Sequence, residues 1–269
     1  MQKQSIEALF RAMYQKKHAF EDFARTPVQP NFVRHEFRRQ GKLREVFSPN
    51  EKLRAHHEFL RLFLLDFLPL NEKVVFSYRK KVSAYDAVVR HTTSKHFFVC
   101  DIKNFFPNIK RDRIRQTIVS GQNACPIADL DKWLEHILDL ICVDDALPMG
   151  FSTSPTTSNS ALFPFDSALQ QYASANGLIY TRYSDDLVIS GVDLSQLKQI
   201  ENTVSALLHD CLNGELKLNS GKSKLLHTGG KIKLLGMSLL PNGTITVDAT
   251  VKSEIEVLIH LYIHYRQKF

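Results

Sequence analysis

Apolar residues return at helical spacing over much of the chain. The clearest stripe contains Leu194, Leu197 and Ile200 and continues to residue 211. The same pattern predicts helices at about 5–23, 49–68, 83–89, 129–141 and 249–267, one from about 110, and one that follows a loop at 144–158 and ends at about 172. Ser48 and Pro49 have the side chains of an N-cap and a first helical turn. In the last helix the residues expected to face inward are Val251, Ile255, Leu258, Ile259, Tyr262 and Ile263.

Short apolar runs rich in β-branched and aromatic residues predict strands between these helices. The run 97–100 ends at Asp101, and two more runs flank Ser184-Asp185-Asp186, which has the length of a hairpin turn. Gly41 and Asn242-Gly243 suit the turns of two further strand pairs. Short strands are also expected at 216–219, 224–227 and 232–235. Helices that alternate with short strands indicate the α+β class.

The composition is that of a globular protein with a cationic excess. The 269 residues are 43% hydrophobic and 23% charged, and 35 basic against 28 acidic side chains leave a net charge of +7. This excess favours polyanionic partners, of which nucleic acid is the commonest. Four scattered cysteines indicate reduced thiols rather than disulfides or a zinc site. No signal peptide is expected, and the run Phe59 to Leu70 is too short to span a bilayer, so a cytoplasmic protein without membrane contact is predicted.

The feature that bears chemistry is the pair of acids Asp185 and Asp186 at the hairpin tip. Two neighbouring carboxylates repel each other unless a cation lies between them. The alternative is that they are ordinary polar residues of an exposed turn, as most such pairs are. Asp101 ends another strand 84 positions earlier (185 − 101). If the two strands are neighbours, the carboxylates meet at one edge of the sheet, where two cations about 4 Å apart would serve phosphoryl transfer. No catalytic histidine is then required.

Three motifs in this order carry a resemblance. Asp101 to Phe106 reads D-I-K-N-F-F, Leu147 to Pro155 contains L-P-M-G and then S-P, and Tyr183 to Asp186 reads Y-S-D-D. Together they resemble the first palm motif, the L-P-Q-G-x-x-x-S-P motif and the Y-x-D-D motif of the reverse transcriptases. These are RNA-directed DNA polymerases with a right-hand fold of fingers, palm and thumb, and the resemblance implies a palm that contains an antiparallel sheet with helices and a short thumb. The resemblance covers about residues 35 to 240.

The resemblance implies a catalytic centre that holds two Mg²⁺ ions. Asp101 and Asp185 would ligate both metals, with Asp186 beside them as the third catalytic carboxylate. The carbonyl of Ile102 would complete a metal shell.

The resemblance also implies contacts with the incoming dNTP. The backbone N–H groups of Asn104 and Phe105 would cradle its triphosphate, and Arg44 with Lys42 would clamp it from a fingers hairpin. Phe106 matches the family's steric gate, which presses on the sugar where a ribose 2′-hydroxyl would lie. The alternative for Phe106 is an aromatic of the core.

Further positions are implied beneath the templating base pair and beside the leaving group. Gly150 would shape the nucleotide-side loop together with Ser154 and Pro155, while Met149 stands where the family usually has glutamine and so places sugar checking in doubt. Lys222 would support the leaving pyrophosphate. The primer or template contacts implied are Tyr183, Ser184 and Gly236. Weaker candidates are Arg38, Arg39 and, in place of Lys222, Lys224.

The resemblance further implies a domain order and a branch of the family. Fingers would span 1–94, the palm 95–236 with fingers helices inserted at about 112–143, and a short thumb 237–269. The segment from Ser83 to His91 looks like that of bacterial retron and defence-associated enzymes, although the retron Val-Thr-Gly motif is absent near the thumb.

Three functions remain open at this point. The first is a polymerase that copies a cognate noncoding RNA into DNA in antiphage defence, with dNTPs, an RNA template, nascent DNA and an effector protein as possible partners. The second is template-independent or protein-primed DNA synthesis, which the short thumb suggests. The third is a non-catalytic RNA-binding scaffold, against which the three acids argue, because clustered carboxylates without a metal would only lower stability. The oligomeric state is not indicated by the sequence.

Overall fold

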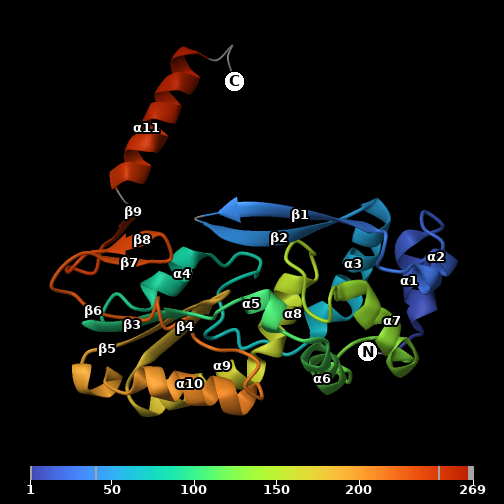
Figure 1. Cartoon of the computed structure of the whole chain (residues 1–269), viewed down its shortest axis with the longest axis horizontal. Helices are drawn as coiled ribbons and strands as arrows, with labels where there is room; N and C mark the ends of the chain where they lie inside the picture. The colour runs from blue at the N-terminus through green and yellow to red at the C-terminus, as the bar shows by residue number, and fades with distance from the viewer. Residues whose placement is uncertain (1, 40, 248, 266–269) are drawn as a thin grey trace.

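A four-stranded antiparallel sheet lies at the centre of the chain (Figure 1). The structure is a computed structural model that describes residues 2–39, 41–247 and 249–265; the side chains of Arg39 and Lys42 lie outside this description. The strands are β3 (His96–Asp101), β4 (Ile179–Tyr183), β5 (Asp186–Gly191) and β6 (Lys224–His227), in the order β4-β5-β3-β6. The antiparallel sheet that the sequence predicts for the palm is therefore confirmed.

The two faces of this sheet are buried against different layers. Successive side chains of β3 point to opposite faces, so Phe98 and Cys100 enter the main core with Leu169 of α9 (Phe163–Ala175) and Leu208 of α10 (Ile200–Cys211). Phe97 faces the other way. It belongs to a second core with Val88 of α4 (Ala84–Val89) and Ile232 of a small sheet. That sheet contains β7 (Ile232–Leu234), β8 (Met237–Leu239) and β9 (Ile245–Val247).

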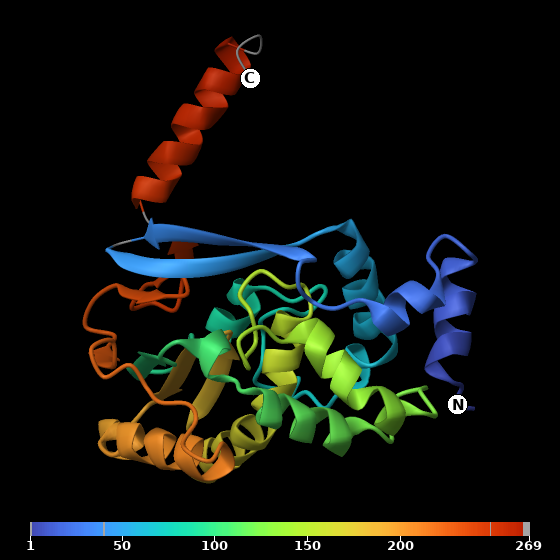
Figure 2. The same ribbon diagram turned by 45° about the vertical axis from the view of Figure 1, so that its right-hand side comes forward.

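The helices α1, α2, α3, α6, α7 and α8 lie together on one side of the molecule, and a long hairpin lies across its top (Figures 1 and 2). The hairpin consists of β1 (Phe32–Arg39) and β2 (Lys42–Pro49), and Gly41 takes the positive φ of 74° that its turn requires. The other elements are α1 (Ile6–Tyr14), α2 (Phe20–Arg25), α3 (Glu51–Phe63), η1 (Leu65–Phe67), α5 (Phe105–Asn108), α6 (Arg111–Gly121), α7 (Leu130–Ile141), α8 (Ser154–Ala161), η2 (Leu194–Leu197) and α11 (Ala249–His264).

Several element boundaries differ from those expected. Ser48 and Pro49 do not begin α3, because Ser48 pairs with Val33 inside the hairpin and the Asn50 side chain caps the helix by accepting a hydrogen bond from Leu53 N. The segment 5–23 is broken between α1 and α2. Residues 216–219 form a single bridge to β3 rather than a strand.

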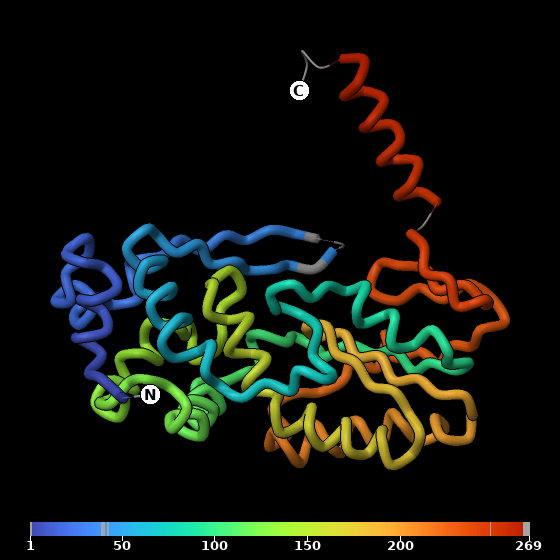
Figure 3. The backbone as a smooth tube through the Cα atoms, turned by 180° about the vertical axis from the view of Figure 1, so that it is seen from behind, coloured from blue at the N-terminus to red at the C-terminus, as the bar shows by residue number. Residues whose placement is uncertain are grey.

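The inward packing expected for the last helix is wrong. None of the described residues of α11 is buried, and Ile259 is 53% exposed. The helix projects away from the body in opposite views (Figures 1 and 3). Its apolar periodicity predicts the helix correctly, but no described element lies against it to cover that face.

The cysteines and the lengths of the helices were also considered in the sequence analysis. All four cysteines are free, and Cys211 is the one that is not fully buried. Among the described residues, no helix combines the length and the apolar character needed to cross a membrane.

A buried histidine ties α4 to the central sheet. The ring of His91 is 0% exposed and hydrogen-bonds to the hydroxyls of Ser190 on β5 and Thr181 on β4, at 2.6 and 2.7 Å. Burial lowers the pKa of His91 to about 3, and it lowers the pKa of His56 and of His57 to about 4. These rings stay neutral in the fold but take up protons in the unfolded chain.

We therefore predict that acid weakens the fold through these rings. The unfolded chain binds more protons than the folded one below pH 6.5, so the free energy of unfolding falls as the pH drops from 7 to 5, by about 2 kcal/mol for His91 alone. Urea unfolding at pH 7 and at pH 5 measures the change in the free energy of unfolding. His91→Gln should remove the part of that change that His91 contributes. The matched change at the exposed His209 should leave it intact. An unchanged pH dependence in His91→Gln would show that this ring is not buried in its neutral form.

Candidate active site

The strand register brings the three predicted acids to one edge of the central sheet. Asp101 lies opposite Asp186 in the β3–β5 pair, and the backbone N–H of Ile102 donates to the carbonyl of Asp185 at 2.9 Å. Residues paired across neighbouring strands project to the same face. The strands that carry these acids are thus neighbours, which is the condition that the sequence analysis set for a shared site, and the acids come from both strand ends.

The carboxylates interact strongly with one another. Asp186 is an exposed residue, but its carboxyl group is partly buried. This burial, together with the charges of Asp185 and Asp101, raises the pKa of Asp186 to about 6. Asp101 is only 6% exposed; one of its oxygens accepts a hydrogen bond from the Lys222 ammonium, which raises the pKa of that lysine. The other oxygen, Oδ1, is buried and has no hydrogen-bond partner among the described residues.

These groups fit a hard divalent cation. Within the described residues no three acidic, histidine or cysteine side chains form a ready coordination cluster. A buried carboxylate oxygen without a donor is costly, however, and the like charges at Asp185 and Asp186 are most simply offset by a cation. Carboxylate oxygens are the ligands that Mg²⁺ prefers, with substrate phosphates and water completing its shell. The candidate ligands are Asp101, Asp185, Asp186 and the carbonyl of Ile102.

Ser184, at the hairpin tip that carries Asp185, is hydrogen-bonded through its N–H, its hydroxyl and its carbonyl. Ser184 has a positive φ of 61°, which is uncommon for a residue other than glycine. Its N–H donates to Ser77 Oγ at 2.8 Å, its hydroxyl hydrogen-bonds with Tyr78 OH at 2.7 Å, and its carbonyl accepts from Arg182 Nη1 at 3.0 Å. The tip therefore has one well-defined conformation.

A fully buried ion pair supports this tip from below. Arg182 and Asp166 are both 0% exposed and make two parallel hydrogen bonds, from Nε at 2.8 Å and from Nη2 at 2.6 Å. Burial alone would lower the pKa of Arg182, but the Asp166 charge holds it above its usual value. Tyr180 OH also donates to Asp166, and Asn159 accepts from Arg182. The guanidinium thus links α9, α8 and the hairpin tip.

Sequence reasoning missed this network, although a signal was present. Asp166 occupies one position of the otherwise apolar α9 stripe that includes Leu162 and Leu169. Arg182 interrupts the strand beside the acids, on the same face as Tyr180. An acid in a buried helical stripe and a base in a buried strand together indicate a buried pair, because each alone would be too costly.

The segment after Asp101 turns sharply at Asn104. This residue has a positive φ of 49° and precedes the short helix α5, where Phe105 is buried in the core. Phe106 is only half-buried, and its ring centroid lies 6.4 Å from that of Tyr78. Phe106 therefore lies next to Tyr78, whose hydroxyl contacts Ser184 at the hairpin tip.

The loop from Leu147 to Pro155 is fixed against the long hairpin. Met149 O accepts from Phe47 N at 2.8 Å. Gly150 has a φ of 106°, and a Cβ there would lie 2.4 Å from the carbonyl oxygen of Phe47, so both backbone conformation and space require glycine. Ser154 is buried, and its hydroxyl donates to Pro148 O at 2.6 Å. Pro155 occupies the first turn of α8.

The candidate nucleotide and primer contacts on the β1–β2 and β7–β8 hairpins lie at exposed positions. Arg44 lies opposite Phe37 in the β1–β2 pair, and Arg38 is exposed on the same hairpin. The side chains of Lys42 and Arg39 lie outside the described part of the chain. Gly236 and the preceding Leu235 both have positive φ, which is the signature of a tight type I′ turn between β7 and β8.

An antiparallel sheet with acids on two adjacent strand ends, an aromatic beside them and a hairpin above is the arrangement of a nucleotide polymerase. Comparison of the chain with known protein families agrees with this and identifies the family. The chain belongs to the reverse transcriptase (RNA-dependent DNA polymerase) family, whose sequence profile matches residues 33–239. The family and the enzyme class that the motifs predict are thereby confirmed.

Relatives and solved structures of this family match over most of the chain. It is 26% identical to the retron Ec73 reverse transcriptase of Escherichia coli, over 83% of this chain and 73% of that protein. It is 29% identical to the retron Ec48 reverse transcriptase of the same species, over 87% of this chain and 58% of that protein. Among solved structures, apo telomerase from Candida tropicalis shares the fold with a TM-score of 0.57 at 11% identity, over 84% of this chain and 48% of that one. The chain therefore spans about half to three quarters of the length of these proteins.

We predict that the Arg182–Asp166 pair controls the hairpin tip as well as stability. Arg182→Met leaves an unpaired buried carboxylate and should lower the free energy of unfolding by about 3–5 kcal/mol, whereas Arg182→Met with Asp166→Leu should recover most of that loss. Both variants lose the donor to Ser184 O. The rate of nucleotide incorporation at saturating substrate should therefore be at least about tenfold lower than that of the unsubstituted chain, even in the stable double variant. The reason is that small displacements of reacting groups slow a reaction strongly. Urea unfolding and steady-state kinetics measure the two effects. A double variant that is both stable and fully active would reduce the pair to a structural role.

Proposed function

We propose that this chain is an RNA-directed DNA polymerase that uses two Mg²⁺ ions to add dNTPs to a primer 3′ end. The observation that carries the proposal is the register of Asp101 opposite Asp186, with Asp185 bound through its backbone to Ile102. In the reaction, the primer 3′-hydroxyl oxygen bonds to the α-phosphorus of the dNTP. The bond from that phosphorus to the bridging oxygen breaks, pyrophosphate leaves, and the hydroxyl proton passes to solvent. The bound metals would lower the pKa of the hydroxyl and neutralise the triphosphate.

The side chains of this chain supply position and charge around that reaction. Asp101, Asp185 and Asp186 hold the metals, and the Lys222 ammonium beside Asp101 supports the charge of the departing pyrophosphate. Arg44 reaches the triphosphate from the hairpin above. The turn at Asn104 and Phe105 offers backbone N–H groups to the same phosphates.

The template and primer are held by more distant elements. Tyr183 and Ser184 position the primer end, Gly236 lets the primer backbone approach the β7–β8 turn, and Ser154-Pro155 shape the loop beneath the templating base. In this scheme residues 1–94 form the fingers, 95–236 the palm and 237–269 the thumb.

We further propose that the template is a cognate noncoding RNA and that the product serves bacterial antiphage defence. Similarity to retron reverse transcriptases, at 22–29% identity, supports an RNA template and nascent DNA as partners. Sequencing the nucleic acid that co-purifies with the chain tests this. DNA complementary to one discrete RNA is expected, whereas homopolymeric or protein-linked DNA would contradict templated copying.

We predict that Asp185→Asn abolishes dNTP incorporation. The substitution keeps the shape of the side chain but removes a metal-binding charge, so synthesis in the presence of Mg²⁺ should fall by at least about 10²–10³-fold, as when one group that stabilises the transition state is lost. RNA binding should remain, because no template contact is assigned to this residue. Asp210→Asn, at a side chain that is 75% exposed, is the control. Undiminished synthesis by Asp185→Asn would rule out the two-metal site.

We predict that Phe106→Ala relaxes the choice of sugar. Loss of the ring removes the clash with a ribose 2′-hydroxyl, and rNTP use relative to dNTP use should rise at least about tenfold, the ratio that a steric cost of about 1.4 kcal/mol produces. Single-nucleotide extension kinetics give the ratio. Phe105→Ala is the matched control, because that ring is 5% exposed and its loss should lower stability without altering the ratio. Equal discrimination in Phe106→Ala and the unsubstituted chain would mean that Phe106 is a packing residue.

A further inference from the structure

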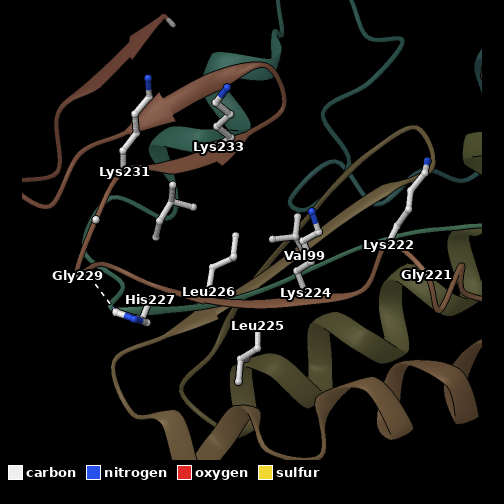
Figure 4. A pocket seen from close by; sticks show the side chains of 12 residues that line it. Val99, Gly221, Lys222, Lys224, Leu225, Leu226, His227, Gly229, Lys231 and Lys233 are labelled. Carbon is white, nitrogen blue, oxygen red and sulfur yellow. Dashed lines mark hydrogen bonds between the residues drawn. The ribbon is translucent and has the colours of Figure 1, made fainter. Parts of the chain in front are cut away.

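The carboxylate site lies at one end of the central sheet, between the two edges of that sheet. The strand order β4-β5-β3-β6 makes β4 and β6 those edges. On the β6 side a cavity of about 750 Å³ follows the strand and begins at Lys222, which contacts Asp101 (Figure 4). Neither Phe106 nor Tyr78 lines this cavity. The ring that is proposed to face the dNTP sugar therefore lies outside it.

On the other side, the β4 edge is extended by the chain segment 74–78. Val75 forms a parallel bridge with Arg182. Phe76 N donates to Arg182 O at 3.0 Å, and Arg182 N donates to Val74 O at 2.7 Å. These backbone bonds fix the segment beside the strand that leads to the hairpin tip. The residues that follow it therefore reach the site from a defined position.

Two consecutive residues of this segment bind the hairpin tip. Ser77 is 0% exposed; its hydroxyl oxygen accepts from Ser184 N at 2.8 Å, and its carbonyl accepts from Asn159 Nδ2 at 2.9 Å. The hydroxyl of Tyr78 then hydrogen-bonds with that of Ser184 at 2.7 Å. Burial raises the pKa of the Tyr78 phenol, so its hydroxyl stays protonated. Ser184 is thus held through its backbone by one residue and through its side chain by the next.

The backbone of Tyr78 takes a conformation that tyrosine rarely adopts. Its φ is 58°, in the left-handed region, where a bulky side chain costs free energy that glycine would not. Such positions concentrate at functional sites, where the surrounding contacts hold the residue in place. The residue is also 45% exposed, so core packing does not account for a tyrosine there. The conformation therefore indicates that the position needs this side chain.

The ring of Tyr78 lies against the ring proposed as the steric gate. The centroids of Tyr78 and Phe106 are 6.4 Å apart and the rings are inclined by 43°, within the range of contacting aromatic pairs. Phe106 is only half-buried. A half-buried ring excludes a ribose 2′-hydroxyl only if it cannot turn aside, because discrimination by a clash requires that the clash be unavoidable. A second ring packed against it limits that movement.

We propose that Tyr78 is a positioning residue that holds the Phe106 ring against the dNTP sugar and links it to the hairpin tip that carries Asp185. The ring of Tyr78 would set how strictly ribose is excluded, and its hydroxyl would set how well the acids are aligned with the primer end. The proposal rests on the proposed function in taking Phe106 as the residue that faces the sugar. It adds a residue of the segment 74–78 whose ring and hydroxyl make separable contributions.

Two substitutions of Tyr78 separate these contributions, and single-nucleotide extension kinetics measure both. Tyr78→Ala removes the ring, so rNTP use relative to dNTP use should rise about two- to tenfold, the range that loss of one aromatic contact produces. Tyr78→Phe keeps the ring and should leave this ratio unchanged. Because it loses one hydrogen bond at the tip, its kcat for dNTP should fall about two- to tenfold without a change in KM. An unchanged ratio in a folded Tyr78→Ala chain would overturn the proposal.

A double substitution tests whether Tyr78 acts through Phe106. In the Phe106→Ala background, Tyr78→Ala should raise the ratio no further, because the effects of two residues that act through one contact are not additive. A full additional rise would contradict the proposal. Tyr85→Ala and Tyr85→Phe are the matched controls, at a tyrosine of α4 that is 54% exposed, and should change neither the ratio nor kcat. An equal rise in Tyr85→Ala would count against Tyr78 as well.

Thermal unfolding of each variant identifies any loss of fold. If Tyr78→Ala does not fold, Tyr78→Leu takes its place, because it removes the aromatic ring but keeps a large side chain. The same rise in the ratio is expected, and its absence would overturn the proposal in the same way.

A measurement without nucleotides separates this role from the polymerase function. With para-fluorophenylalanine incorporated at position 106, fluorine NMR reports the surroundings of that ring. Tyr78→Ala should shift or broaden the resonance, and Tyr85→Ala should not. A chain that synthesises no DNA but shows this change would contradict the polymerase function alone. DNA synthesis with a resonance and a ratio that Tyr78→Ala leaves unaffected would contradict the role of Tyr78 alone.

Discussion

Like charges held close together are the constraint on which the rest of this structure depends. Asp101, Asp185 and Asp186 meet because β3 and β5 are neighbours in register, and partial burial together with their mutual repulsion raises the pKa of Asp186 to about 6. Such a cluster lowers stability unless something offsets it. The Lys222 ammonium offsets part of the charge at one Asp101 oxygen, while the other oxygen remains buried without a donor. A divalent cation at this edge would offset the clustered charge and provide a partner for the buried oxygen of Asp101.

Repelling side chains keep a defined geometry only if the backbone beneath them cannot move. The hairpin tip is fixed at Ser184 by Ser77, Tyr78 and Arg182, and Arg182 is itself fixed by Asp166 inside the core. A buried pair of this kind is weak evidence for stability, since apolar residues often replace such pairs without loss. Its geometry at the tip gives it a positioning role. The nucleotide side is held in a comparable way, because only glycine fits at position 150 between the loop and the long hairpin.

Much of this arrangement could be predicted from the sequence, and the misses have physical causes. The acids and the strand ends that carry them follow from local patterns, because strand periodicity and turn residues act over a few positions, whereas the antiparallel sheet was implied by the resemblance to the family. The polar network around Arg182 and Asp166 joins residues 16 positions apart in different elements, so each local pattern contains a buried charge but does not identify its partner. The start of α3 was misplaced because pairing of Ser48 with Val33 overrides its capping preference. The packing of α11 depends on which element lies against it. The spacing of apolar residues predicts a helix but carries no information about its packing partner.

The central claim is that the three carboxylates form a divalent-cation site, and a Mn²⁺ titration followed by electron paramagnetic resonance tests it most directly. The signal of free Mn²⁺ falls when the ion is bound, so the measurement needs no turnover, primer or template. The account predicts saturable binding by the chain in the presence of a dNTP, lost in Asp101→Asn and retained in Asp210→Asn. Equal Mn²⁺ binding by the unsubstituted chain and by Asp101→Asn would contradict it.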